Sequence, residues 1–156
     1  MSQLHPTNVF HLGEKKTVVQ LCQIKTFQES IEDFCVTADN AALCEIGRNL
    51  RKLKSLRELR ISNSGIPIQV LIQFILRCPQ LEILNFCFME NITDELVLVF
   101  DRLPKLRKFS IYKGALTDIS VDFIIEKCPR LVVDISGDQM ISKTGNRRLK
   151  DFARFR

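Results

Sequence analysis

The chain has 156 residues, of which 46% are hydrophobic and 26% charged, and its formal net charge at pH 7 is +5. This composition is rich enough in apolar side chains for a buried core and excludes a disordered chain, while six glycines and five prolines exclude a collagen-like one. No apolar run is long enough to span a bilayer, and no basic segment followed by an apolar core opens the sequence, so we expect no signal peptide and a cytoplasmic or nuclear protein.

A repeat of 25 residues organises most of the sequence. A proline followed two residues later by leucine recurs in the segments 77–81 (RCPQL), 102–106 (RLPKL) and 127–131 (KCPRL). Self-similarity at such a period is typical of a protein built from stacked units. We therefore expect about five to six strand-turn-helix repeats rather than an ordinary globular domain.

Apolar residues fill three positions of each unit when the leucine after the proline is counted as position one. Position one holds Ile31, Leu56, Leu81, Leu106 and Leu131; position four holds Phe34, Leu59, Leu84, Phe109 and Asp134; position six holds Val36, Ile61, Phe86, Ile111 and Ser136. The spacing of two between positions four and six predicts a short strand, with position five on its other face. The last unit fits only if one residue is deleted, which places Val133 and Ile135 inward.

The second half of each unit predicts a helix. Apolar residues recur at helical spacing in three groups: Val70, Leu71, Phe74 and Ile75; Leu96, Val99, Phe100 and Leu103; Val121, Ile124 and Ile125. Thr93-Asp94 and Thr117-Asp118 supply capping side chains near two helix starts, and the recurring prolines end the helices. Because no unit can bury its apolar edge alone, the units are expected to stack into an α/β solenoid.

The two ends are expected to differ from the repeats at 31–136. Residues 1–30 are predicted to form an N-terminal cap with a degenerate repeat, in which Val9 takes position four and His11 position six. Residues 137–156 are predicted to form a basic C-terminal cap or tail that carries six lysines and arginines against two aspartates. A solvated helix or tail explains that charge. A contact with an anionic partner stays open as the alternative, through Arg147, Arg148, Lys150, Arg154 and Arg156.

The repeats resemble the leucine-rich-repeat family, and most closely the cysteine-containing repeats of F-box/leucine-rich-repeat proteins. The phrases that carry the resemblance are 78–84 (CPQLEIL), 128–131 (CPRL), 92–94 (ITD) and 116–118 (LTD). The resemblance implies a short horseshoe with parallel strands on its concave face. At position nine, where that family has Asn or Cys, this chain has Asp39, Ser64, Met89, Gly114 and Gln139. The usual ladder of turn side chains is therefore expected to be replaced.

Neither catalysis nor metal binding is indicated by the sequence. The six cysteines form no Cys-x-x-Cys pair, and the two histidines lie far from most of them, so no zinc site or cofactor is predicted and the thiols are expected to be free. No phosphate-binding loop, nucleophile elbow or His-Glu-x-x-His motif is present. Cys78 and Cys128 are expected to be small buried side chains.

The candidate site is the strand face that carries positions three, five and seven. Its predicted protein-binding residues are Asp33, Glu58, Arg60, Ser62, Ile83, Asn85, Lys108, Ser110 and Tyr112. Ile83 is expected to form an apolar centre beside Arg60 and Tyr112, two residue types that are enriched where binding energy concentrates.

These residues predict a non-catalytic protein-protein interaction module that is monomeric or part of a larger complex. The resemblance implies the substrate-recognition part of a ubiquitin ligase adapter. The alternative is the ligand-sensing repeat end of an innate-immune nucleotide-binding receptor. Nucleic-acid binding is disfavoured, because the basic excess is confined to the last twenty residues.

Overall fold

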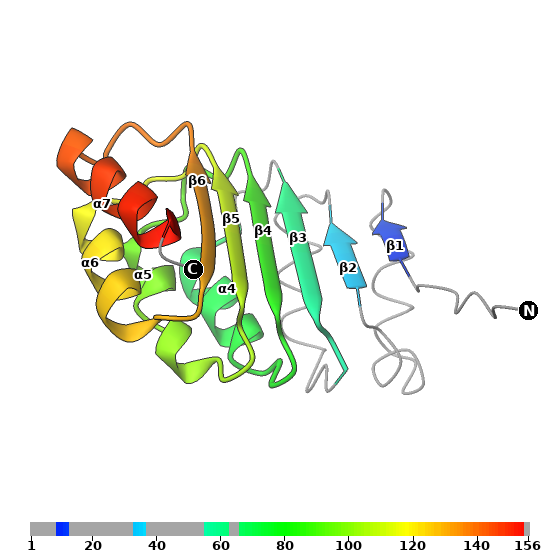
Figure 1. Ribbon diagram of the computed structural model, residues 1–156. Helices are drawn as coiled ribbons and strands as arrows, with labels where there is room; N and C mark the ends of the chain where they lie inside the picture. The colour runs from blue at the N-terminus through cyan, green and yellow to red at the C-terminus, as the bar shows by residue number, and fades with distance from the viewer. Residues whose placement is uncertain (1–8, 13–32, 37–54, 63–65, 155–156) are drawn as a thin grey trace, which may run out of the picture.

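A computed structural model describes residues 9–12, 33–36, 55–62 and 66–154, which form one parallel sheet with helices along one of its faces (Figure 1). The strands are β1 (Val9–Leu12), β2 (Asp33–Val36), β3 (Glu58–Ser62), β4 (Ile83–Cys87), β5 (Lys108–Tyr112) and β6 (Val132–Ser136). They lie in the order of the chain, and each pairs in parallel with the next. The predicted α/β architecture of repeated parallel strands, each followed by helix in the fully described units, is confirmed.

The register of the strands follows the predicted repeat. Position four aligns Phe34, Leu59, Leu84, Phe109 and Val133, and position six aligns Val36, Ile61, Phe86, Ile111 and Ile135. In the last unit, Val133 pairs with Phe109 and Ile135 with Ile111, as the expected deletion of one residue predicts. At the N-terminal end the expectation was wrong by one residue, because Phe10 rather than Val9 pairs with Phe34, and His11 falls at position five. That spacing is 24 residues, which the strict 25-residue frame did not allow.

The core lies between the sheet and the helix layer. Leu59, Leu84, Phe86 and Phe109 are at most 1% exposed, because their side chains point from the strands toward the helices. The ring of Phe109 packs edge-on against Phe86 from β4 and against Phe100 from the helix layer, with centroids 6.2 and 4.9 Å apart. Stacking of one unit on the next therefore buries the apolar positions that no unit can cover alone.

In the described residues, four α-helices and one 3-10 helix lie on that side of β3 to β6 (Figure 1). They are α4 (Ile68–Ile75), α5 (Asp94–Val97), the 3-10 helix η1 (Phe100–Arg102), α6 (Asp118–Lys127) and α7 (Lys143–Arg154). The helix expected over 96–103 is broken into α5 and η1. The β-branched residues Val97 and Val99 at the break have weak helix propensity, and the backbone leaves the α conformation at Val99.

Only one of the two expected caps forms as predicted. The Thr117 hydroxyl accepts a hydrogen bond from the Ile119 backbone nitrogen at 3.2 Å and so caps α6. The Thr93 hydroxyl at the start of α5 makes no such bond and is buried without a partner. Asp94, next to it, instead accepts hydrogen bonds from Thr117 and Ser120 of the following unit.

Of the two cysteines that were expected to be buried, one is buried and the other is only partly so. Cys78 is 1% exposed, and burial raises the pKa of its thiol to about 12. Cys128 is only half-buried, so it is a less complete core residue than expected. The thiols of Cys78, Cys87 and Cys128 are free. No helix in the described part of the chain is both long and apolar enough to cross a membrane.

Candidate protein-interaction surface

The side of the sheet away from the helices, called the open face below, carries positions three, five and seven of each strand. Parallel register arranges these side chains in rows across β3 to β6. Position three aligns Glu58, Ile83, Lys108 and Val132; position five aligns Arg60, Asn85, Ser110 and Asp134; position seven aligns Ser62, Cys87, Tyr112 and Ser136. Asp33 of β2 falls in the first row beside Glu58. The structure thus brings all nine predicted residues onto neighbouring strands.

The expected apolar centre at Ile83 is not formed. Ile83 is half-buried and its registered neighbours are Glu58 and Lys108, whereas Arg60 and Tyr112 belong to the other two rows. Arg60 instead pairs with Glu58 of its own strand, with 2.5 Å between Nε and Oε1. The sequence argument failed because it placed side chains on adjacent strands without fixing their rows.

Besides the exposed Val132 of β6, two exposed aromatic side chains lie at the carboxyl ends of β4 and β5, and we call Phe88, Tyr112 and Lys113 the aromatic edge. Phe88 is 49% exposed and Tyr112 39% exposed, and their rings meet edge-on with centroids 5.0 Å apart at 88°. The Lys113 ammonium lies 4.9 Å from the Phe88 centroid and 5.6 Å from the Tyr112 centroid. A cation held over two exposed rings is stabilised by their π faces.

The backbone fixes the aromatic edge in place. Phe88 and Lys113 have φ of 54° and 57°, and Gly137 in the corresponding place after β6 has φ of 71°. The Phe88 nitrogen donates to the Tyr112 carbonyl at 2.8 Å, and the Lys113 nitrogen donates to the Ser136 carbonyl at 3.0 Å. Strands β4 and β5 are therefore each followed by a left-handed residue whose backbone nitrogen is bonded to the next strand.

Phe88 was missed by the sequence argument, because only positions three, five and seven were assigned to this face, and Phe88 is at position eight. A left-handed conformation is rare for a bulky aromatic residue, and it marks a place where the surroundings hold a strained backbone. A signal did exist, since Gly137 occupies the corresponding position in the last unit once the one-residue deletion is applied. Glycine there indicates a left-handed site that Phe88 fills with an exposed ring.

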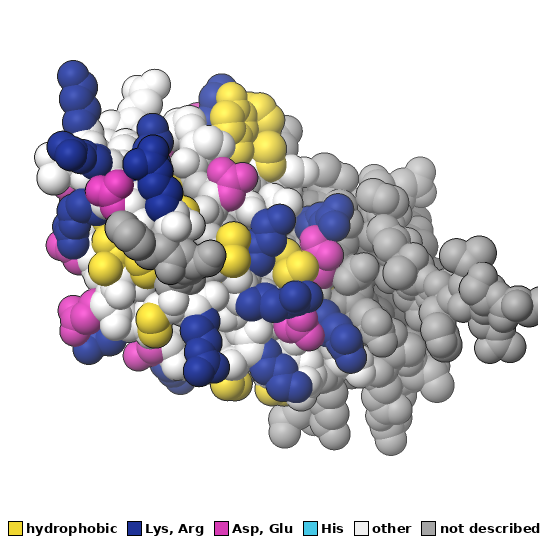
Figure 2. All heavy atoms as spheres, in the orientation of Figure 1, with side chains coloured by type: hydrophobic (Ala, Val, Ile, Leu, Met, Phe, Trp, Pro, Cys, Tyr) yellow, Lys and Arg dark blue, Asp and Glu magenta, His cyan; other side chains and the backbone are white. Residues whose placement is uncertain are grey.

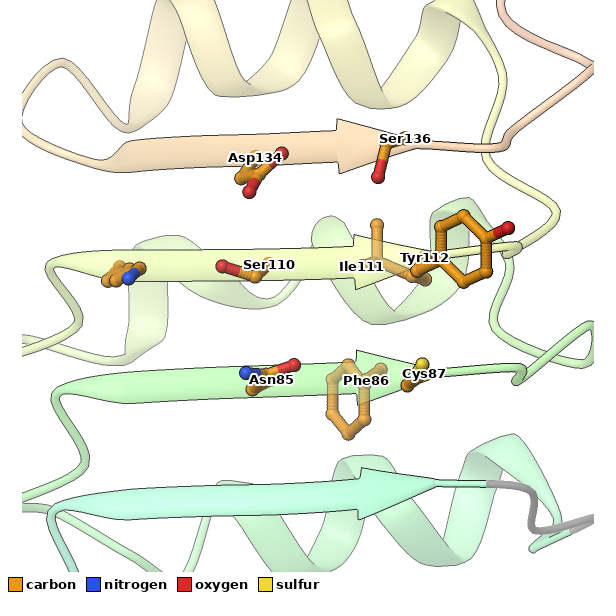
Figure 3. A pocket seen from close by; sticks show the side chains of 9 residues that line it. Asn85, Phe86, Cys87, Ser110, Ile111, Tyr112, Asp134 and Ser136 are labelled. Atoms are coloured by element: carbon orange, nitrogen blue, oxygen red, sulfur yellow. The ribbon is translucent and has the colours of Figure 1, made fainter.

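A shallow hollow lies on the open face beside the aromatic edge. It has a volume of about 240 Å³ and lies over β4, β5 and β6. Figure 3 shows Asn85, Ser110, Tyr112, Asp134 and Ser136 around it. Lys108 also lines it. The hollow thus sets polar side chains next to the exposed ring of Tyr112.

The basic residues of the C-terminal segment are partly neutralised by nearby acids. Arg148 of α7 pairs with Asp122 of α6, and Arg154 lies 3.9 Å from Asp151. Arg147 and Lys150 are exposed, with no acidic partner in the described part of the chain, and Arg156 lies outside it. Figure 2 shows Lys and Arg side chains mixed with Asp and Glu at the end of the molecule where α6 and α7 lie. These charges form no continuous basic face there.

Metal-ligating side chains do not gather in the described residues, where no three of His, Cys, Asp and Glu lie close enough to hold an ion. On the open face, the Asn85 amide, the Ser110 hydroxyl and the Asp134 carboxylate share one row, and the Lys108 ammonium lies in another. What the surface offers is hydrogen-bonding groups and exposed rings.

Comparison with known proteins identifies a family and similar solved structures. The sequence matches the family described as "FBD-associated F-box protein At5g56370, LRR repeats" over residues 48–140. Among solved structures, the tropomodulin C-terminal domain of Caenorhabditis elegans is similar, with a TM-score of 0.60 and 14% identity over 91% of this chain and 92% of that chain. At that identity the likeness shows the fold alone. No curated protein matches.

Proposed function

Since the chain belongs to the family of F-box-associated leucine-rich repeats, in which repeats serve as protein-interaction modules, we propose that it binds a partner protein through the open face and the aromatic edge. The observation that carries this proposal is the exposed pair of Phe88 and Tyr112, packed against each other and held by a left-handed backbone. Exposed aromatic side chains on a rigid support are where binding energy concentrates in interfaces.

The polar rows beside the aromatic edge supply the specificity of the proposed interface. Asn85, Ser110 and Lys108 line the hollow next to Tyr112 and offer amide, hydroxyl and ammonium groups to a partner side chain. Aromatic anchors surrounded by such groups are the usual anatomy of a protein interface. The module acts without catalysis in this proposal.

We further propose that the partner is a substrate which a ubiquitin ligase of the F-box type recognises. The support is the family, whose description names an F-box protein. The same match favours this role over the alternative of a nucleotide-binding immune receptor. The role concerns which complex the module serves, and it is separate from the question of which surface binds.

Affinity capture from cell lysate tests both proposals with the full chain. We compare the wild type with the double variant Phe88→Ser, Tyr112→Ala and with the matched control Leu98→Ala, which removes another exposed apolar side chain on the helix side of the fold. The double variant should lose partners that the wild type and the control retain. If all three forms recover the same partners, the aromatic edge is not the binding surface.

The ligase role is tested by the identity of what is captured. Recovery of ligase scaffold subunits with the wild type, or ubiquitination of a captured partner that depends on this chain, supports the adapter role. If the wild type captures specific partners but neither ligase subunits nor ubiquitination is found, the adapter role is contradicted. The proposal that the chain binds a partner protein is then still supported.

A further inference from the structure

Strand β6 forms the end of the described sheet, and its outer edge has no strand partner among the described residues. It pairs with β5 on one side and is the last strand in the order β1 to β6 (Figure 1). Across the described part of the chain, no backbone hydrogen bond is made on the other side of Val132–Ser136. A free strand edge is a template on which an extended segment of another protein can add as a further strand.

The apolar layer is also incomplete at this end. Val133 and Ile135 continue the rows of Phe109 and Ile111, which are 0% and 2% exposed. Val133 and Ile135 themselves are only half-buried, because β6 has no strand beyond it. A segment that pairs with β6 would cover them if its own inward residues were apolar.

The charge on the open face of β6 indicates which kind of extended segment could pair with this strand. Asp134 lies at the centre of the strand, is exposed, and continues a row whose other members on β4 and β5 are the uncharged Asn85 and Ser110. No ion pair engages its carboxylate in the described residues. A second copy of this chain, paired symmetrically about the strand centre, would set two Asp134 carboxylates opposite each other, which is unfavourable.

We propose that β6 accepts an extended segment of a partner protein in which a lysine or arginine is flanked on both sides by apolar residues. The basic side chain lies beside Asp134 on the open face, and the flanking residues turn inward over Val133 and Ile135. The chain itself shows that such a strand fits this sheet, because β3 carries Leu59-Arg60-Ile61 with the leucine and isoleucine buried and the arginine exposed. This proposal does not depend on the aromatic edge.

A labelled peptide with the sequence of residues 57–62 (RELRIS) serves as the probe, and the same peptide with glutamate in place of its second arginine is its control. Binding to the chain of 156 residues is measured by fluorescence anisotropy, and strand addition by hydrogen exchange of the amides of residues 132–136. The wild type should bind the arginine peptide about fivefold more tightly than the glutamate peptide, which is the size expected for a cross-strand charge pair. Exchange in β6 should slow when the arginine peptide binds.

Two variants test whether Asp134 causes the preference for the arginine peptide. Asp134→Lys should reverse the preference between the peptides, and the exposed site makes the substitution compatible with folding, which circular dichroism checks. Asp101→Lys makes the same change of charge on η1 and should keep the wild-type preference. Equal affinity for both peptides, protection outside β6 without protection of β6, or self-association of the wild type that protects β6 would each overturn the proposal.

Discussion

Asp94 accepts two hydrogen bonds from Thr117 of the next unit, at 2.9 Å from the backbone nitrogen to Oδ1 and at 2.6 Å from the hydroxyl to Oδ2. Asp118 repeats the relationship with Ser142, again at 2.9 and 2.6 Å. Each aspartate therefore holds the residue that begins the following helix. These bonds join the helix layer from unit to unit.

Replacing Asp94 should destabilise the stack without disturbing the open face. Asp94→Ala removes acceptors from Thr117 and Ser120 and leaves buried donors unsatisfied, so we expect a loss of about 1–2 kcal/mol in the free energy of unfolding. Urea denaturation measures the loss. Asp134→Asn, at an exposed aspartate without a hydrogen bond in the described residues, is the control and should change stability little. A similar loss in both variants would contradict the capping role.

The same aspartates should make stability depend on pH below about 5. Burial by itself would raise the pKa of Asp94, but hydrogen bonds from Ser120 and Thr117 lower it below its ordinary value. Hydrogen bonds from Ser142 lower the pKa of Asp118. A carboxylate whose folded pKa is depressed contributes stability above its unfolded pKa of about 4, and that stability is lost as the pH falls through the folded pKa.

Asp138 has the opposite effect on the pH dependence of stability, because burial raises its pKa. Its protonation favours the folded state, so it offsets part of the loss on acidification. Thermal unfolding from pH 6 to pH 2 should therefore show a fall in midpoint that is smaller in Asp94→Asn and steeper in Asp138→Asn than in the wild type. Parallel curves for the three proteins would show that these carboxyls do not set the acid response.

Phe88 allows a test of the strained backbone at the aromatic edge. Phe88→Gly and Phe88→Ala both remove the ring contact with Tyr112, but only glycine relieves the φ of 54°. We expect the glycine variant to be the more stable by about 1 kcal/mol, as measured by urea denaturation. The same two substitutions at Cys87, inside β4, should give the reverse order, since glycine weakens a strand. Equal stability of the two Phe88 variants would show that the backbone there carries no strain.

How much of the molecule the sequence predicts depends on whether a feature repeats. The strand rows were predictable because Leu59, Leu84 and Phe109 recur at one spacing. A shift of the strand pairing by one residue would turn these apolar side chains to the open face, so only one register buries them. The aromatic edge was predictable only in part: Tyr112 belongs to a row, whereas Phe88 is exposed by a backbone conformation that its residue type disfavours. The bond from Asp94 to Thr117 joins side chains of different units, and its geometry depends on how the helices stack.

Gly145 of α7 provides the sharpest test of that stacking. Alanine is normally favoured over glycine inside a helix by about 1 kcal/mol. Gly145 is buried, however, and a Cβ there would overlap Asp118 Oδ1 and lie 2.9 Å from Ile141 Cγ2. Asp118 would have to move away from Ser142, so we expect Gly145→Ala to destabilise the protein by about 1–3 kcal/mol, while Thr144→Ala on the exposed side of the helix does not.

A double-mutant cycle separates that clash from a general effect on α7. In an Asp118→Ala background the main obstacle to the new Cβ is gone, so Gly145→Ala should cost much less than it does in the wild type. Urea denaturation of the four proteins gives the coupling energy directly. Additive effects would mean that Gly145 is required by the packing of Ile141 alone, and that Asp118 does not position the last helix.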